Sequence, residues 1–377
     1  MKILYIAHIR LPTERAHGIQ IMKMCGAFAL SGNGVELVIP KRFNHLKEEP
    51  FTYYGEKKNF KVTKIFSFDF DLGKLGRIKF WLQYFSFITS AIFYVFKKKP
   101  DIVYVREIVL AYLLSLFGVK VVFEDHELPR SNLFFYKFFL KRIKKKVIVA
   151  HNLKAVYEQL GVKNNSYIII PNGVDIDEFS NINKDKSIFK ELGLKGGTKA
   201  VLYVGHFYKW KGVYTLLDSI GEMAENATAV LIGGTVENMD DINKYITENG
   251  IERVVVSGFA PHKKVIQFIK SADVLILPNT AKEKRSAMYT TPIKLFEYMA
   301  SGVPIVASNL PSFSKYLKDE ENSLLFEPDN AESLAEKVNI LLGNHSAGEK
   351  LSRKAYDEVH EFTWQKRVEK ILNFVNN

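Results

Sequence analysis

Cysteine is nearly absent from this sequence, whose 377 residues include only Cys25. A single cysteine excludes an internal disulfide, so we expect a reducing compartment rather than a disulfide-stapled secreted fold. Long hydrophobic runs are also absent, and without a window of about 18 apolar residues we expect no membrane span. The first residues run straight into a strand-like segment with no basic start and cleavage site, so we expect no signal peptide.

What is present is a globular composition, with 47% hydrophobic and 25% charged residues. One hydrophobic core rarely grows beyond about 250–300 residues, so the length predicts two domains. The net charge of +12 is uneven: residues 1–180 hold 28 Lys and Arg against 16 Asp and Glu, and residues 181–377 hold 25 of each. Such a one-sided positive field attracts an anionic partner, which is a membrane surface, a phosphorylated substrate or nucleic acid.

Short runs rich in Val and Ile alternate with longer amphipathic stretches along the chain. The runs predict strands at residues 2–7, 35–40, 102–106, 120–124, 146–150, 167–171, 200–205, 229–233, 253–258, 274–278, 304–307 and 323–326. The stretches predict helices at residues 19–31, 77–97, 153–160, 213–224, 262–271, 292–301 and 331–342. This α/β alternation predicts two Rossmann-like domains with doubly wound parallel sheets that face a central cleft, with the boundary within residues 171–199.

The loop after the strand at 200–205 is the first with a chemical pattern. Parallel sheets bind ligands beyond the carboxyl ends of their strands. Gly205 would let the backbone approach a ligand closely, and Lys211 would offer a fixed positive charge to a diphosphate. A strand, glycine, lysine and helix in this order are common, so the alternative is an ordinary loop with a solvated lysine.

A second pattern follows the strand at 274–278. Thr291 is a natural helix N-cap and Pro292 suits the first helical position, so the free backbone N–H groups of the first turn would form an anion site. Glu297 lies more than one turn into this helix, where its carboxylate can accept hydrogen bonds from the two hydroxyls of a ribose. Gly302 is expected to end the helix. The alternative is a core helix on which Glu297 is simply exposed.

These patterns resemble glycosyltransferase family 4, the retaining, nucleotide-sugar-dependent transferases with the GT-B fold. Gly205, Lys211 and Gly212 match the family's loop for the donor diphosphate, and Glu297 matches the second glutamate of its paired-glutamate motif. Segments 171–175, 273–278, 302–307 and 362–365 also match family segments, so the resemblance covers nearly the whole chain. Two positions depart from the pattern: His206 stands for the usual arginine, and Tyr289 stands for the first glutamate.

The departures change what the resemblance implies. A protonated His206 would still donate to a phosphate, with a charge that depends on pH. Tyr289 cannot take a carboxylate's role, which would then pass to Lys294 or to backbone amides. A variant with Ser or Thr before Pro-x-Lys, and then Phe-Glu-Tyr-Met-Ala, is familiar among bacterial members. We therefore interpret both departures as marks of a subtype.

The resemblance also assigns roles in both domains. Gly18 corresponds to a glycine loop that faces the donor diphosphate, and His126 to a histidine near the sugar and the acceptor. The alternatives are an ordinary helix start and a structural histidine. The implied catalytic residues are His126, Lys211 and Glu297. The implied donor-binding residues are Gly18, Gly205, His206, Lys211, Gly258, Phe259, Tyr289, Thr291, Pro292, Ile293, Lys294 and Glu297.

The resemblance predicts an acceptor domain at 1–175, a donor domain at 176–361, and a last helix at 362–377 that returns to the first domain. The expected activity is that of a hexosyltransferase. It would move a sugar from a UDP- or GDP-linked donor to a glycan or lipid-linked acceptor, with retention of configuration, in surface polysaccharide or lipopolysaccharide biosynthesis. The GT-B fold class generally needs no bound metal, so the resemblance implies neither a metal nor another cofactor. Two alternatives stay open: a nucleotide-sugar 2-epimerase of the same fold, and a non-catalytic subunit that binds nucleotide or glycan.

Two segments of the first half combine aromatic residues with clustered lysines, at 78–99 and 133–146. This combination is typical of a helix that lies at a membrane surface. The alternative is a pair of ordinary packed helices with solvated lysines at their ends. We expect a cytoplasmic protein with peripheral contact to the inner face of an anionic membrane. No nucleic-acid module is recognisable, so nucleic acid is not an expected partner.

Overall fold

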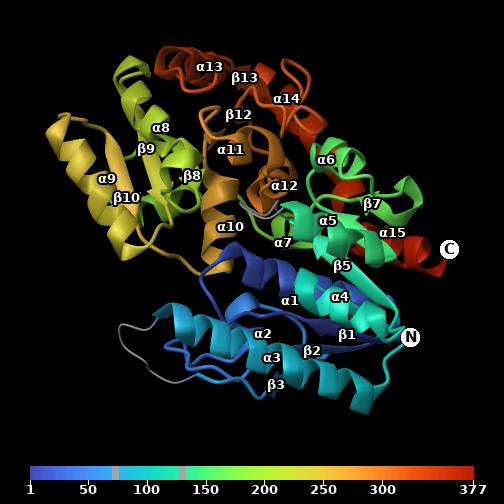
Figure 1. Cartoon of the computed structure of the whole chain (residues 1–377). Helices are drawn as coiled ribbons and strands as arrows, with labels where there is room; N and C mark the ends of the chain where they lie inside the picture. The colour runs from blue at the N-terminus through green and yellow to red at the C-terminus, as the bar shows by residue number, and fades with distance from the viewer. Residues whose placement is uncertain (70–75, 127–132) are drawn as a thin grey trace. The chain divides into compact units, whose positions relative to one another are not determined.

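The computed structural model describes residues 1–69, 76–126 and 133–377. These residues form two compact units, and each is described by itself (Figure 1). The first unit comprises Met1–Pro171 and Trp364–Asn377, and the second comprises Asn172–Thr363. Within the described ranges, no helix has both the length and the apolar character that crossing a membrane requires.

A seven-stranded sheet forms the centre of the first unit. Every neighbouring pair of strands is parallel, in the order β3-β2-β1-β4-β5-β6-β7. The strands are β1 (Lys2–Ile6), β2 (Gly34–Pro40), β3 (Lys61–Ile65), β4 (Ile102–Val105), β5 (Val121–Asp125), β6 (Lys145–Ile148) and β7 (Tyr167–Ile169). The helices are α1 (Ala16–Leu30), α2 (Pro50–Tyr54), α3 (Gly76–Lys98), α4 (Ile108–Leu116), α5 (Leu133–Arg142), α6 (Leu153–Gln159) and α15 (Trp364–Asn376).

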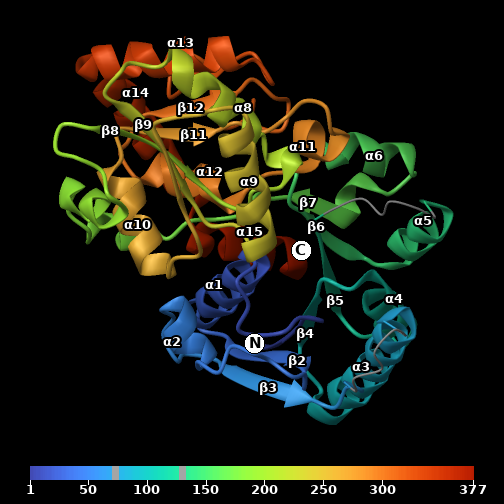
Figure 2. The same cartoon turned by 90° about the vertical axis from the view of Figure 1, so that its left-hand side faces the viewer.

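Helix α15 joins the first unit from the far end of the chain and packs against α1 (Figure 2). Trp364, Val368, Ile371 and Val375 are buried in the same core as the residues of β1 and α1. Full burial of one such side chain contributes about 1.5–3 kcal/mol to stability. The first unit therefore depends on both ends of the chain for its hydrophobic core.

The second unit contains a six-stranded parallel sheet in the order β10-β9-β8-β11-β12-β13. The strands are β8 (Lys199–Val204), β9 (Ala227–Ile232), β10 (Val254–Ser257), β11 (Val274–Leu277), β12 (Ile305–Ser308) and β13 (Leu324–Phe326). The helices are α7 (Ile176–Ser180), α8 (Val213–Ser219), α9 (Val236–Glu248), α10 (His262–Ser271), α11 (Lys284–Tyr289), α12 (Ile293–Ala300), α13 (Ala331–Gly343) and α14 (His345–Val359).

Both sheets have Rossmann-like topology, because their strand order reverses beside the first strand of each unit. In the second unit, this switch point lies between β8 and β11, and the loops that leave these strands carry most of the residues singled out in the sequence. The predicted fold class of two Rossmann-like parallel-sheet domains is confirmed.

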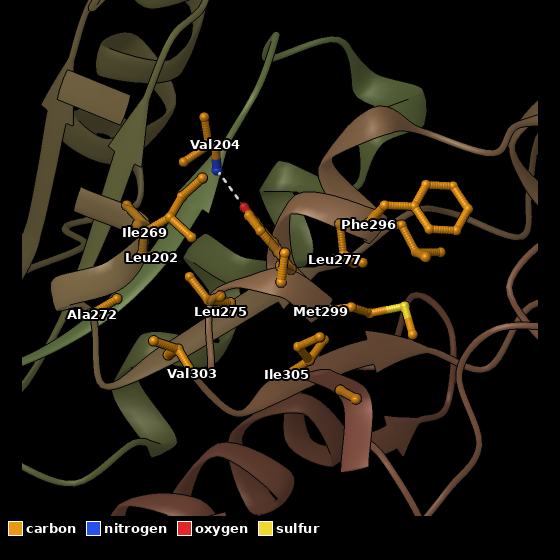
Figure 3. Packing of buried hydrophobic residues seen from close by; sticks show 14 of the residues in the cluster. Leu202, Val204, Ile269, Ala272, Leu275, Leu277, Phe296, Met299, Val303 and Ile305 are labelled. Carbon is orange, nitrogen blue, oxygen red and sulfur yellow. Dashed lines mark hydrogen bonds between the residues drawn. The ribbon is translucent and has the colours of Figure 1, made fainter. Parts of the chain in front are cut away.

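Helix α12 is fixed against β8 by packing and by one hydrogen bond (Figure 3). Leu202 and Leu275 of the strands share a buried cluster with Phe296 and Met299 of the helix. The backbone N–H of Val204, at the end of β8, donates to the Tyr298 hydroxyl at 2.9 Å. This contact ties the C-terminal half of α12 to the end of β8, where the loop that holds Lys211 begins.

Candidate functional site

The loop that follows β8 depends on glycine for its packing. Gly212 has a φ of +71°, and a Cβ there would lie 1.7 Å from the carbonyl oxygen of Pro278, just after β11. Gly205 has a φ of +156°, and a Cβ there would lie 2.9 Å from the Tyr203 hydroxyl. Contacts within the chain therefore explain both glycines, and the role of Gly205 in donor binding stays a prediction.

Lys211 lies in this loop on the face of an aromatic ring. Its Nζ is 4.2 Å from the ring centroid of Trp210. Burial lowers the pKa of Lys211 to about 8, and the nearby positive charge of Arg285 adds to the effect. Arg285, which the sequence analysis missed, lies in α11 with its guanidinium carbon 5.0 Å from the same ring centroid. No motif spacing links Arg285 to the loop, so only the fold brings them together.

His206 belongs to a row of aromatic rings in the same loop. Its ring centroid is 5.1 Å from that of Tyr208, and the Tyr208 and Trp210 centroids are 6.2 Å apart, both pairs being stacked. The backbone carbonyl of His206 accepts a hydrogen bond from the Tyr203 hydroxyl at 2.7 Å. The position of the family's usual arginine is therefore filled by a histidine that stacks on its neighbours.

Helix α12 begins one residue later than the sequence analysis predicted. Its N-cap is Pro292 and its first helical residue is Ile293, with no capping side chain. The predicted roles of Thr291 as N-cap and Pro292 as first helical residue are therefore wrong. Thr291 is buried and its carbonyl accepts a hydrogen bond from the Asn172 side chain at 3.1 Å, so it belongs to the preceding loop. Gly302 follows the C-cap residue with a φ of +71°, which confirms that it ends the helix.

Glu297 is 3% exposed, so the alternative of an exposed glutamate on a core helix is wrong. Its Oε2 accepts a hydrogen bond from Lys294 Nζ at 2.5 Å, one turn earlier on α12. Its Oε1 is 4.0 Å from Nε2 of His262, which in turn lies 3.4 Å from a carboxylate oxygen of Glu178. The sequence analysis missed the last two residues as members of this cluster, because they come from α10 and α7 with no common spacing.

The remaining donor-side residues are placed as follows. The carbonyls of Ser257 and Gly258 both accept from the N–H of Gly233, at 3.0 and 3.2 Å. The Phe259 side chain is 53% exposed. Tyr289 ends α11, with the ammonium of Lys284 at 5.9 Å from its ring centroid. None of these contacts tests the predicted roles in donor binding.

In the first unit, Glu124 is a fully buried carboxylate that organises the surroundings of His126. It accepts hydrogen bonds from Gln20 at 2.6 Å and from His126 Nε2 at 2.5 Å, and also from the Tyr104 hydroxyl. Arg367 of α15 pairs with it at 3.2 Å. Burial alone would raise the pKa of Glu124, but the positive charge of Arg367 and the hydrogen bond from His126 outweigh it and hold the pKa well below its usual range.

His126 is uncharged at neutral pH. Burial and the neighbouring Arg106 lower its pKa to about 4, against the opposing effect of Glu124. Since the Glu124 carboxylate can only accept, the neutral ring donates from Nε2 and keeps its lone pair on Nδ1. Glu127, the next residue of the sequence motif, lies outside the described residues.

Gly18 lies inside α1, where the space for a side chain is already filled. A Cβ there would be 2.1 Å from the Tyr54 hydroxyl oxygen. That hydroxyl donates to the carbonyl of Thr13 and accepts from its N–H, both at 2.8 Å. Packing within the unit thus accounts for the glycine, and its contact with a donor stays a prediction.

The aromatic segments at 78–99 and 133–146 differ from the sequence interpretation in one respect. Several large apolar side chains of α3 and α5 are about half or more exposed, among them Phe80, Trp81, Phe85, Phe93, Phe134, Phe135 and Phe138. The second segment, however, is a helix followed by β6, and Lys146 is buried in that strand. Its ammonium donates to the carbonyls of Leu140 and Ile143 at the end of α5, so it does not belong to the exposed lysines.

Two family models match the sequence. The model for glycosyl transferases group 1 matches residues 184–358, and the model for Glycosyltransferase Family 4 matches residues 19–178. The chain belongs to glycosyltransferase family 4. This confirms the resemblance drawn from the sequence motifs, and the two matches fall on the two structural units.

Curated relatives of this family 4 chain are distant. TuaC of Bacillus subtilis, a putative teichuronic acid biosynthesis glycosyltransferase, is 23% identical over 284 residues, which cover 70% of this chain and 67% of the relative. The phosphatidyl-myo-inositol mannosyltransferase of Mycobacterium leprae is 27% identical over 227 residues, or 57% of this chain and 54% of the relative. The chain thus spans between about half and two thirds of the length of these relatives.

The fold is shared over the full length of a solved structure. HepE of Anabaena, crystallised in complex with UDP-glucose, has a TM-score of 0.78 and 17% identity, and the match covers 100% of this chain and 99% of HepE. At this identity the likeness establishes the fold, which is GT-B.

Proposed function

We propose that this family 4 chain is a retaining glycosyltransferase. In this proposal it moves a sugar from a UDP- or GDP-linked donor to a glycan or lipid-linked acceptor of a cell-surface polysaccharide or lipopolysaccharide. The observation that carries the proposal is the buried Glu297 on a helix fixed to the end of β8, whose loop holds Lys211. HepE, which has the same fold, binds UDP-glucose, and the name of TuaC points to a surface glycan.

The donor residues would act on the leaving group. Cleavage of a nucleotide sugar leaves a diphosphate with growing negative charge, so catalysis requires positive groups that are already in place. Lys211 would supply one such charge. Backbone N–H groups in the first turn of α12 would supply donors at the positive end of the helix dipole. Glu297 would accept hydrogen bonds from the ribose hydroxyls, with Lys294 partly neutralising its charge.

His126 would orient a hydroxyl group rather than supply charge. Its neutral ring offers the Nδ1 lone pair to the proton of a sugar or acceptor hydroxyl, and Glu124 keeps that tautomer. Retention would follow from attack on the face that the diphosphate leaves, with a phosphate oxygen taking the acceptor's proton. We propose that no metal takes part, so the rate should be the same in EDTA as without it.

The donor class can be identified by thermal shift. A ligand that binds only the folded state raises the melting temperature by mass action. Purified protein is heated with UDP, GDP, ADP and their common sugars, each over a range of concentrations. The proposal predicts a concentration-dependent rise with one uridine or guanosine diphosphate. If none of these nucleotides raises the melting temperature, the proposed function is wrong.

Catalytic roles are tested with Lys211→Ala and Glu297→Ala. Removal of one charge-assisted contact of this kind costs on the order of 10²–10³ in kcat. We expect losses of that size for both variants with little change in melting temperature, and an unchanged rate for Lys209→Ala, an exposed lysine in the same loop. Incubation of the donor without acceptor separates the alternatives: an epimerase would convert the sugar, and a non-catalytic subunit would neither transfer nor slowly hydrolyse it.

We also propose that α3 and α5 place the first unit on an anionic membrane, where a lipid-linked acceptor resides. Exposed aromatic rings of these helices would enter the interface, and their lysines would meet the lipid headgroups. The whole excess of positive charge lies in the first 180 residues, which agrees with this orientation.

A vesicle sedimentation assay tests the membrane contact. We expect binding to vesicles with anionic lipid, weaker binding to neutral vesicles, and a loss in the variant with Phe134→Glu and Phe135→Glu. The matched control carries Val236→Glu and Ile340→Glu, which place the same two charges at exposed apolar side chains of the second unit. Negligible binding to both kinds of vesicle would contradict the membrane proposal and leave the donor proposal intact.

A further inference from the structure

Two positive side chains from separate segments meet at one indole ring. Lys211, in the loop after β8, and Arg285, in α11, both lie on Trp210, with distances to its centroid of 4.2 and 5.0 Å. Three of the six strands of the second sheet, β9, β10 and β11, lie between the two segments in sequence, yet the fold brings both charges to the same ring. The Arg285 charge contributes to the lowered pKa of Lys211, because a nearby positive charge disfavours the ammonium form.

The backbone around Arg285 is held firmly. The carbonyls of Ser286 and Ala287 both accept hydrogen bonds from Ser312, each at 3.0 Å. The carbonyl of Arg285 itself accepts from the Thr290 hydroxyl at 2.9 Å. The backbone that carries Arg285, in the segment between β11 and α12, is therefore held in place by contacts within the second unit.

An anion that contacts both Lys211 and Arg285 would offset the repulsion between their charges. Two neighbouring cations repel each other, and each cation–π contact with the ring contributes only about 0.5–2 kcal/mol of stabilisation. An anion with oxygens on two linked phosphates can accept from both, and a planar guanidinium can bind such oxygens in pairs. A monophosphate offers fewer oxygens over a shorter span, so it cannot satisfy both groups equally well.

We propose that Arg285 is a ligand of the donor diphosphate, together with Lys211. In this chain it takes the part of the family's usual arginine, whose position is filled by the stacked His206. The inference rests on the proposed function, because it assumes that a nucleoside diphosphate binds at the end of β8. It adds a binding residue that lies in a different segment from the family's diphosphate loop.

The neighbouring Lys284 provides a matched control. It is also basic and lies next to Arg285 in α11, but it is exposed and its ammonium faces the ring of Tyr289 at 5.9 Å. Removal of its charge changes the net charge of the unit as much as removal of the arginine does. A general electrostatic effect would therefore appear in both variants, and a direct contact in only one.

The test compares diphosphate with monophosphate binding by calorimetry. Dissociation constants for UDP and UMP, and for GDP and GMP, are measured with the wild type, Arg285→Ala, Arg285→Lys and Lys284→Ala. For whichever diphosphate the wild type binds, we expect Arg285→Ala to weaken diphosphate binding about 10–100-fold and to leave monophosphate binding nearly unchanged. Arg285→Lys should recover part of the loss, and Lys284→Ala should match the wild type.

Each other outcome overturns the proposal in a distinguishable way. Unchanged diphosphate binding by Arg285→Ala shows that the residue makes no contact, while the proposed function stands. An equal loss of diphosphate and monophosphate binding, or an equal effect of Lys284→Ala, shows that Arg285 acts on the fold or the overall charge. If the wild type binds none of these nucleotides, the proposed function fails and this inference fails with it. Melting temperatures of the variants, and the conservative Arg285→Lys, guard against misfolding.

Discussion

Burial lowers the pKa of Lys211, the proposed cation, and of His126, the proposed hydrogen-bond acceptor. His126 loses its charge at neutral pH because its pKa falls to about 4, so it can accept a hydrogen bond. Lys211 keeps most of its charge at pH 7, but its pKa of about 8 puts the loss of that charge within the range of an ordinary experiment. The same physical cause, desolvation, thus lowers the pKa of both side chains, and each loses its charge in a different pH range.

The affinity for a nucleoside diphosphate should therefore depend on pH. Binding requires the Lys211 ammonium, which is present below its pKa of about 8 and lost above it. Arg285 is the charged neighbour that acts on this lysine. We expect constant affinity for UDP or GDP from pH 6.5 to 7.5 and a fall approaching about tenfold per pH unit above 8. Lys211→Arg, whose charge persists, should show a flat profile in calorimetry; a flat wild-type profile would refute the assignment.

At single positions, the motifs located residues near one another in sequence and missed those from distant segments. Lys211 could be predicted because it lies in the loop just after a strand, and Glu297 because it lies just over one turn into a helix that the sequence marks. Arg285 and His262 could not, because only the folded chain brings them to Trp210 and Glu297. Thr291 was misplaced because cap preference ignores the bond from Asn172 to its carbonyl, which keeps it in the loop.

At the scale of elements, two glycines with the same φ of +71° end or begin helices in very different surroundings. A Cβ at Gly302 would meet nothing within 4 Å, whereas a Cβ at Gly212 would run into the Pro278 carbonyl. At Gly302, glycine is needed only because the backbone adopts the left-handed conformation. The second also lets the loop after β8 pack directly against the end of β11.

Alanine substitutions should separate these two effects. We expect Gly302→Ala to lower the free energy of unfolding by about 1 kcal/mol, the cost of the left-handed conformation. Gly212→Ala adds a clash with backbone and should cost at least about 3 kcal/mol or displace the loop and weaken nucleotide binding. Urea unfolding and calorimetry measure the two properties. Equal effects of the two variants would show that the loop does not need its close contact.

Most strands could be predicted because they are continuous apolar runs, as buried parallel strands tend to be. Strand β3 was missed because it lies at the edge of its sheet, and of its five residues only Ile65 is buried. Helix α15 was expected, but the role of its arginine was not. A weak signal existed, since Arg367 falls on the helix face that carries Trp364 and Val368.

At the scale of the whole molecule, a buried ion pair joins the last helix of the chain to β5 of the first unit. Arg367 is 2% exposed, and its guanidinium pairs with Glu124 and donates to the carbonyls of Ile170 and Pro171. The last helix therefore supplies the counter-charge for the carboxylate that holds His126. Stability and the orientation of a proposed catalytic residue are linked through one contact.

Removal of the Arg367 charge should strongly reduce the stability of the fold. Loss of one partner of a buried pair destabilises by about 3–5 kcal/mol, so Arg367→Met should lower the melting temperature strongly, while Lys370→Met on the exposed face should not. The depressed pKa of Glu124 stabilises the fold above the ordinary value of 4.5, and this contribution declines as the pH falls below it. The deficit of Arg367→Met should thus be smaller at pH 3.5 than at pH 7. Calorimetric melts at both values check this, and a deficit independent of pH would contradict it.

The return of α15 to the first unit has a consequence for biosynthesis. A ribosome delivers residues 1–171 long before residues 364–376, with the entire second unit in between. Until the final helix emerges, the nascent first unit lacks part of its core, and Glu124 lacks its ion pair with Arg367. The first unit thus begins synthesis first but is completed last. A chain that ends before α15 would expose the apolar surface that this helix covers, and chaperones or proteases would recognise that surface.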